Sequence, residues 1–160
     1  MLKRLTNTQK DFSLAFARIL FGVVFFAHGA QKMLGWFGGA GFSGTMSDFS
    51  RFGMPAVVAL FAIVVEFFGG LSLLFGLLPR VAACAVIIEM IGAILTFHVH
   101  NGFFMNWTGH QKGEGIEYHL IAIALSLLIV VHGAGAFSID RKTSSIQCSA
   151  STQPAHSSVG

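Results

Sequence analysis

Ionisable side chains interrupt the apolar stretches of this sequence, at positions where they are expensive unless they serve a purpose. They are Arg18, His28, Glu66, Glu89, His98 and His132. Charged groups are rare in hydrocarbon and usually mark pathways or binding sites, so each is a functional-site candidate. Carboxyl and imidazole groups in such places can hold protons or bind the polar part of a ligand.

Four apolar stretches carry these residues, at about 12–34, 54–78, 81–100 and 117–137. A helix rises about 1.5 Å per residue and a bilayer core is about 30 Å thick, so about 20 apolar residues make one crossing. Charged residues form only 11% of the chain, against about 25% in soluble domains. The sequence therefore predicts an all-α integral membrane four-helix bundle, and nucleic-acid binding is not expected.

Basic residues indicate how the chain crosses the membrane. Those flanking the spans on one side are Lys3, Arg4, Lys10, Arg80, Arg141 and Lys142. Because Lys and Arg are enriched in cytoplasmic segments, we expect both termini in the cytoplasm and the two longer loops, 35–53 and 99–115, outside. The predicted organisation is a cytoplasmic segment at 1–11, one transmembrane domain at 12–140 and a disordered, Ser-rich cytoplasmic tail at 141–160.

The first outer loop has a pattern of its own. Phe42, Met46 and Phe49 recur at helical spacing with Ser and Asp residues between them. This pattern favours a short amphipathic helix lying in the membrane interface. An aromatic loop packed onto the bundle is the alternative.

Three of the ionisable residues are expected in the middle of the membrane. Counted from the cytoplasmic helix ends, Arg18 lies about 9 Å deep, Glu89 about 12 Å and Glu66 about 18 Å. Arg18 is thus expected to neutralise Glu89 or to reach Glu66. Such a network could carry protons, or it could only specify the fold.

A second polar layer is expected near the outer surface, formed by His28, Lys32, His98, Glu117 and His119. Imidazole, ammonium and carboxyl groups at the mouth of an apolar bundle suit the polar head of an amphiphile whose tail lies between the helices. Quinones fit, because their carbonyl groups need hydrogen-bond donors and their reduction needs protons. The alternative is that these residues are simply interfacial.

Small residues indicate which helix faces point inward. Ala62, Gly69 and Gly70 share a helix face with Glu66, and Gly92 and Ala93 share one with Glu89. Membrane helices approach closely where such residues lie, because close packing must replace the hydrophobic effect. Both carboxyl groups are therefore expected to point into the bundle.

Metal and haem sites receive less support. The histidine spacing matches no specific ligand pattern, so no metal site is predicted. His28 with His98 could supply the two axial ligands of a haem, which is the third functional alternative. The two cysteines, Cys84 and Cys148, form no CxxC motif, which argues against a thiol relay.

The order of these features resembles the DoxX family of bacterial membrane proteins over residues 12–140. The carrying residues are Arg18, His28-Gly29, Lys32, Glu66, Gly69-Gly70, the turn Gly76-Leu77-Leu78-Pro79-Arg80, Glu89, Asn101-Gly102-Phe103-Phe104, Gly115, Glu117 and the closing run from Gly133 to Asp140. The Ser-rich tail lies outside the pattern. The resemblance implies a multi-pass protein of the bacterial cytoplasmic (inner) membrane, of a kind often labelled oxidoreductase.

The leading hypothesis is a quinone-linked redox subunit whose electrons come from a partner protein, since the chain carries no flavin or nucleotide fingerprint. The alternative is a membrane module without enzymatic activity, either a scaffold or a handler of small solutes or lipids. Besides the lipid bilayer and the redox partner, the sequence leaves a homo-oligomer open.

Overall fold

The computed structural model describes residues 11–140, and these residues form helices and loops without a β-strand. The elements in chain order are α2 (Phe12–Leu34), η1 (Trp36–Gly38), α3 (Gly41–Arg51), α4 (Ala56–Val64), η2 (Val65–Gly69), α5 (Gly70–Phe75), α6 (Pro79–Ala93), η3 (Ile94–His98), η4 (Val99–Asn101) and α7 (Glu117–His132). The predicted N-terminal segment up to residue 10 and the predicted tail from residue 141 lie outside the described residues.

Three continuous helical rods are long and apolar enough to cross a membrane. They are Phe12–Leu34, Ala56–Phe75, which joins α4, η2 and α5, and Pro79–Asn101, which joins α6, η3 and η4. The fourth apolar helix, α7, has 16 residues, so it is about 24 Å long. The all-α membrane fold is thus confirmed, and α3 is the short helix expected in the first outer loop.

The helix ends follow from local chemistry. Asp11 caps α2 by accepting a hydrogen bond from the Leu14 N–H at 3.0 Å, and Gly35, with φ 74°, follows the last helical residue, Leu34. Glycine favours this left-handed conformation because it has no Cβ to clash. The last span was expected to reach residue 137, but α7 ends at His132 and Gly133 has φ 88°. The segment that follows turns back over the bundle, where its carbonyl oxygens accept hydrogen bonds from Arg18.

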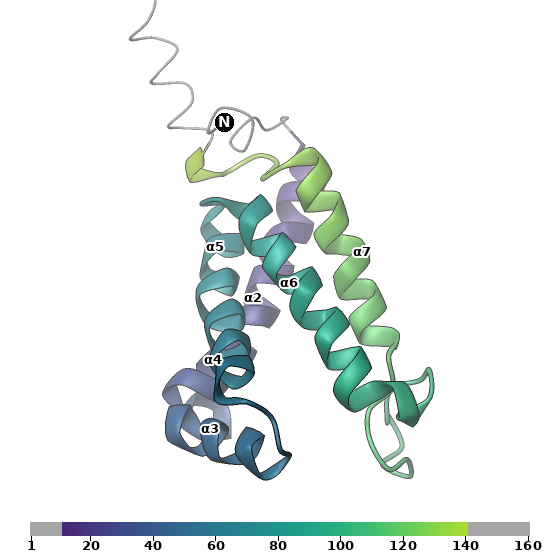
Figure 1. Ribbon diagram of the computed structural model, residues 1–160. Helices are drawn as coiled ribbons and strands as arrows, with labels where there is room; N and C mark the ends of the chain where they lie inside the picture. Colours follow the sequence, from purple (N-terminus) through teal and green to yellow (C-terminus); the bar gives the residue numbers. More distant parts are fainter. Residues whose placement is uncertain (1–10, 141–160) are drawn as a thin grey trace, which may run out of the picture.

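The helices converge at one end of the molecule and splay at the other (Figure 1). At the converging end lie the start of α2, the turn between α5 and α6, and the segment after α7. The Asp11 carbonyl accepts a hydrogen bond from the Ala136 N–H at 2.9 Å, and the Leu78 N–H donates to both carboxylate oxygens of Asp140. Both ends of the described chain therefore lie on the same side, as an even number of crossings requires.

Glycines bring α2 against the second rod. A Cβ at Gly29 would overlap the backbone of Phe67, one at Gly70 would overlap the backbone of Phe26, and one at Gly22 would lie 2.6 Å from the Leu74 nitrogen. Close approach of this kind is how membrane helices gain packing energy without a hydrophobic driving force. The prediction that Gly70 marks an inward face agrees with this contact.

We expect Gly29→Ala to destabilise the protein by about 1–3 kcal/mol, because the added methyl group meets backbone that cannot rotate away. The midpoint of unfolding in mixed micelles with increasing SDS, followed by circular dichroism, measures the effect. Gly69→Ala is the matched control, since a Cβ there would make ordinary contacts of 3.8 and 3.9 Å. Equal midpoints for the two variants would contradict the expected role of Gly29.

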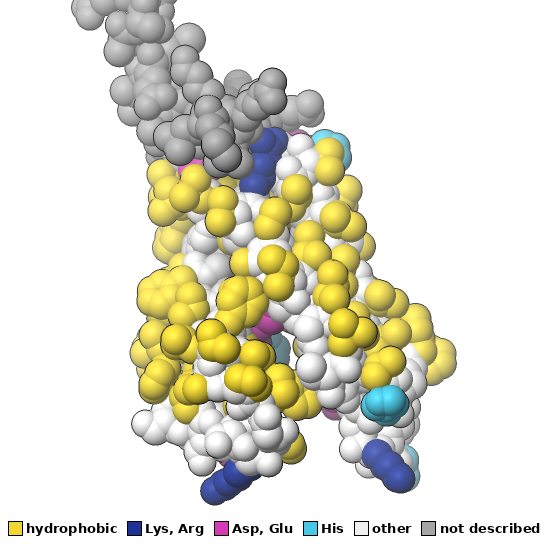
Figure 2. Space-filling model, viewed as in Figure 1, with side chains coloured by type: hydrophobic (Ala, Val, Ile, Leu, Met, Phe, Trp, Pro, Cys, Tyr) yellow, Lys and Arg dark blue, Asp and Glu magenta, His cyan; other side chains and the backbone are white. Residues whose placement is uncertain are grey.

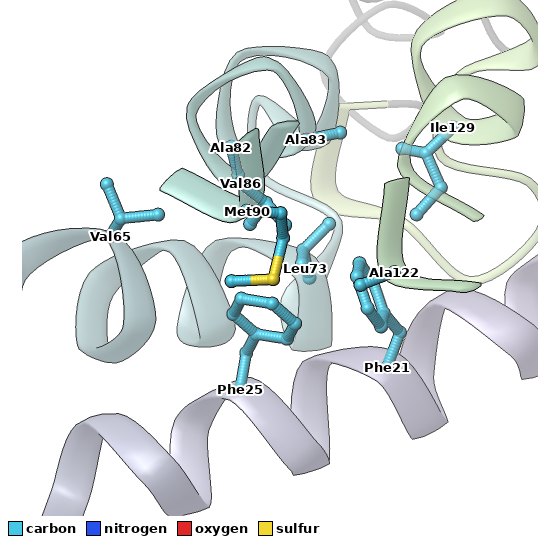
Figure 3. Packing of buried hydrophobic residues seen from close by; sticks show 10 residues of the cluster. All are labelled: Phe21, Phe25, Val65, Leu73, Ala82, Ala83, Val86, Met90, Ala122 and Ile129. Atoms are coloured by element: carbon cyan, nitrogen blue, oxygen red, sulfur yellow. The ribbon is translucent and has the colours of Figure 1, made fainter. Parts of the chain in front are cut away.

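The hydrophobic core lies between the packed helices (Figure 3). It is formed by Phe21, Phe25, Val65, Leu73, Ala82, Ala83, Val86, Met90, Ala122 and Ile129. Large apolar side chains also cover the outside, as Figure 2 shows, whereas Arg18, Glu89 and His119 are buried. An apolar exterior around polar interior groups is the arrangement expected of a protein in lipid.

Candidate functional site

A cavity of about 740 Å³ opens between the splayed ends of the helices. Its walls come from α2, from α4 and η2, from α6 and η3, and from the start of α7, and Phe49 of α3 and Met54 lie at its outer side. Figure 2 shows the hollow on one face of the molecule, with an acidic side chain and a histidine visible at its floor. The cavity is therefore apolar at its rim and polar at depth.

The polar floor is built around an ion pair between two helices. Lys32 of α2 lies with its Nζ 2.5 Å from Oε2 of Glu66 in η2. The carboxyl group of Glu89 in α6 lies within hydrogen-bonding reach of Glu66. One ammonium group therefore lies beside two carboxyl groups that come from facing helices.

Two interruptions of the α-helical pattern aim side chains into the cavity. Val65–Gly69 and Ile94–His98 are π-helical turns, and they contain Glu66 and His98 respectively. A π-turn inserts a residue and rotates the following side chains, and such turns recur at functional sites. Both lie on the cavity wall, where a regular helix would present its residues at a different angle.

Two histidines from different helices meet at the outer side of the floor. The rings of His98 and His119 are 4.1 Å apart between centroids, at an angle of 45°. His98 Nδ1 lies 2.8 Å from the Glu114 carbonyl oxygen, to which it donates as the protonated nitrogen. This bond leaves Nε2 as the free nitrogen of His98.

Tyr118 completes the floor and was not anticipated from the sequence. It lines the cavity within electrostatic reach of Glu66 and Glu89. It is the single tyrosine of a chain with 17 phenylalanines. This contrast could have singled out Tyr118 in the sequence, because a phenol supplies a hydroxyl group that the phenyl rings of the phenylalanines lack.

Arg18 does not join this cluster, contrary to the expectation that it would neutralise Glu89 or Glu66. It is fully buried at the converging end of the bundle, where it donates to the carbonyl oxygens of Leu73, Leu74, Ala134, Ala136 and Phe137. Asp140 lies close enough to interact with its charge. Lys32 takes the place beside the carboxyl groups that was predicted for Arg18.

The reason is a stagger between helices. Gly22 of α2 contacts Leu74 near the end of α5, and Gly29 contacts Phe67. The ten residues from Phe12 to Gly22 therefore extend α2 about 15 Å beyond the level of Leu74. Depths counted from helix ends assumed one common starting level, so they placed Arg18 too close to Glu66 and Lys32 too far from it.

The predicted outer layer is only partly assembled. His28, Lys32, His98 and His119 all line the cavity, together with Glu66 and Glu89 of the predicted inner layer. Glu117 is separate from the lining and accepts a hydrogen bond from the Trp107 indole at 3.0 Å. The two layers expected from the sequence thus merge into one site, without Arg18 and Glu117.

Within residues 11–140, no group of three or more His, Cys, Asp or Glu side chains is placed to hold a metal ion. His28 and His98, the predicted haem-ligand pair, both line the cavity, and the ring of His98 lies against that of His119. The polar groups that line the cavity are imidazole rings, an ammonium group, a phenol and carboxyl groups.

Several known bacterial proteins have sequences similar to this chain. A protein of Bacillus subtilis named "Putative oxidoreductase CatD" is 25% identical over 84% of this chain and 89% of its own length. The inner membrane protein YqjF of Escherichia coli is 29% identical over 82% of this chain and 92% of its own length. An uncharacterised protein of Haemophilus influenzae is 32% identical over 86% of this chain and 97% of its own length. No solved structure matches the chain.

The sequence model of the DoxX family matches residues 13–99, which run from α2 to the start of η4. This part of the chain contains Lys32, Glu66, Glu89 and His98, so most of the polar floor lies within the matched region. Together with the membrane-spanning helices, the match identifies this chain as a multi-pass membrane protein of the DoxX family.

Proposed function

We propose that this protein binds a quinone-like amphiphile in the cavity and serves as the membrane subunit of a redox system. The observation that carries the proposal is the cavity itself, with polar groups at its floor and apolar walls. Its volume of about 740 Å³ falls within the range of about 300–1,000 Å³ typical of small-molecule sites.

The floor offers the groups that a quinone head requires. The Lys32 ammonium group, the Tyr118 hydroxyl and an imidazole N–H are donors for carbonyl oxygens. Glu66 and Glu89, which lie within hydrogen-bonding reach of each other, place two carboxyl groups that can exchange protons next to the same space. A bound quinone would take up two electrons from a partner protein and two protons to become a quinol.

The relatives support the membrane and redox parts of this proposal. One relative is named as an oxidoreductase and others as inner membrane proteins. We infer the same membrane for this chain, with both termini in the cytoplasm, because Arg80 lies at the start of α6 at the converging end and the other basic residues of the predicted cytoplasmic side precede residue 11 or follow residue 140 in the sequence. In that orientation the cavity lies in the outer half of the bilayer.

Tyr118→Phe tests the site with the smallest possible change. The variant keeps the ring and removes one hydroxyl group, so we expect the affinity for decylubiquinone in nanodiscs to fall about 10-fold, the effect of about 1.4 kcal/mol. Equilibrium binding measures this, and mass spectrometry of molecules extracted from the purified protein identifies the native ligand.

Asp48→Asn is the control, because the Asp48 side chain is half exposed and pairs with Arg51 on the surface. It should bind like the wild type. A protein that binds no quinone and copurifies only with phospholipid would refute the quinone proposal and favour a lipid-handling module. A lipid-handling module would need only the apolar walls of the cavity and none of the polar groups at its floor.

A further inference from the structure

The cavity has a lateral opening between α4 and α6. The helix α4 packs against α2, α3 and η2, whereas α6 packs against α7, η2 and α5. The two helices diverge from η2 toward the outer end (Figure 1). Residues of both line the cavity, so the space between them belongs to it.

The opening is closed at both ends. At the inner end, η2 packs against α6, where a Cβ at Gly69 would lie 3.9 Å from that of Ala82. At the outer end, the ring of Phe97 contacts those of Phe49 and Phe52, with centroids 6.2 and 6.1 Å apart. What remains is a window, which we define by the lining residues Val57, Phe61, Ile88, Gly92 and Thr96.

The window faces lipid rather than water. Its edges are apolar and outward-facing, with Val57 70% exposed, Ile88 63% and Phe61 38%. Ile88 and Thr96 lie about 14 and 25 Å along the rod from Pro79, and a bilayer core is about 30 Å thick. A molecule that passes through the window therefore arrives from, or extends into, the hydrocarbon of the membrane.

Gly92 leaves the window open. A Cβ at this position would meet nothing within 4 Å, although Gly92 lies within the third rod and lines the cavity. Glycine weakens a helix interior, and here no neighbouring helix requires its small size. The space beside Gly92 is therefore open where the cavity meets the bilayer.

We propose that the ligand of this cavity is a membrane-dissolved molecule with a long alkyl or isoprenoid chain, which enters through the window and lies across Gly92. The window spans about 12 Å from Ile88 to Thr96, which is too short for a partner's membrane helix but sufficient for a flexible chain. This inference depends on the proposed function only for the chemical identity of the ligand's polar head group. Any amphiphile with a long apolar chain fits the window.

Photolabelling tests the window without assuming a quinone. A long-chain alcohol with a diazirine in its chain is incorporated into nanodiscs that hold the protein, and labelled residues are mapped after illumination. Ala62 and Met90 line the cavity but are only 8% and 5% exposed, so label on them reports a chain inside. We expect both to be labelled in the wild type, and Gly92→Leu to reduce this labelling at least five-fold.

Two controls accompany the labelling. Ala124→Leu also introduces a leucine, at an exposed position of α7 outside the cavity lining, and should leave labelling unchanged. Leu127, which is 50% exposed on α7, should be labelled equally in all variants. Absence of label at Ala62 and Met90 in the wild type, or equal label in Gly92→Leu, would overturn the window.

A second measurement separates this inference from the quinone proposal. Gly92→Leu should bind a long-tailed ubiquinone at least ten-fold more weakly than the wild type and a tail-less benzoquinone with equal affinity. Equal loss for both ligands would overturn the role of Gly92 as the place of the chain. If the wild type binds neither quinone while the alcohol labels Ala62 and Met90, the result supports entry of a chain through the window and refutes binding of a quinone head group.

Discussion

Replacing Arg18 by Met is expected to destabilise the protein by more than about 3 kcal/mol. The guanidinium group donates to five carbonyl oxygens from α5 and from the segment after α7. Each buried polar group left without a partner costs about 1–3 kcal/mol, and Met restores none of the hydrogen bonds. The free energy of unfolding in SDS-containing micelles measures the loss.

Arg51→Met is the matched control for Arg18→Met. Its side chain is 78% exposed and pairs with Asp48 on the surface, where ion pairs contribute only about 0–1 kcal/mol. Arg18→Lys should recover only part of the stability, because an ammonium group has three donors and lacks the planar fork of a guanidinium. An Arg18→Met protein as stable as Arg51→Met would show that the segment after α7 does not depend on Arg18.

The second large effect is expected at the polar floor of the cavity. Lys32→Met leaves Glu66 and Glu89 facing each other without their cation, and breaking a buried pair on one side costs about 3–5 kcal/mol. Glu66 is 12% and Lys32 26% exposed, which favours the lower end of this range. We therefore expect a loss of about 3 kcal/mol in the free energy of unfolding.

The double variant Lys32→Met/Glu66→Gln should recover most of that loss, since it removes both charges of the pair. A double-mutant cycle with the two single variants gives their coupling energy. Additive effects would mean that the pair contributes nothing as a pair. The pairing of Asp48 with Arg51 offers the control cycle, with a coupling near zero.

The same cycle addresses whether the charged floor serves the fold or the ligand. If the double variant is stable and binds decylubiquinone as the wild type does, the pair only specifies helix packing. If it is stable but binds much more weakly, the floor contacts the ligand. The sequence leaves both interpretations open, and the cavity beside the pair favours the second.

Helices and membrane class could be predicted from composition and periodicity alone. Apolar runs of about 20 residues leave few structures other than helices, because every backbone polar group must find a partner within the chain in lipid. The short helix α3 was visible in the spacing of Phe42, Met46 and Phe49. The residues that matter chemically were also visible, since an ionisable group in an apolar run is conspicuous by itself.

The sequence could not decide which of these groups meet. Their depth depends on the stagger of α2 against the second rod, and this is set by the contacts of Gly22, Gly29 and Gly70 with backbone on the facing helix. Because of this packing, Arg18 lies among the carbonyl oxygens at the converging end, and Lys32 lies next to Glu66. The π-turns at Val65–Gly69 and Ile94–His98 added a rotation that regular helical spacing does not include.

The sequence by itself determined the number and nature of the apolar helices and the list of polar groups among them. Only the tertiary structure decided that Lys32, Glu66, Glu89, Tyr118 and three histidines share one cavity, while Arg18 and Glu117 lie elsewhere. The physical reason is that helix formation depends on local pattern and solvent, whereas the axial shift between helices depends on backbone contacts between residues far apart in the chain.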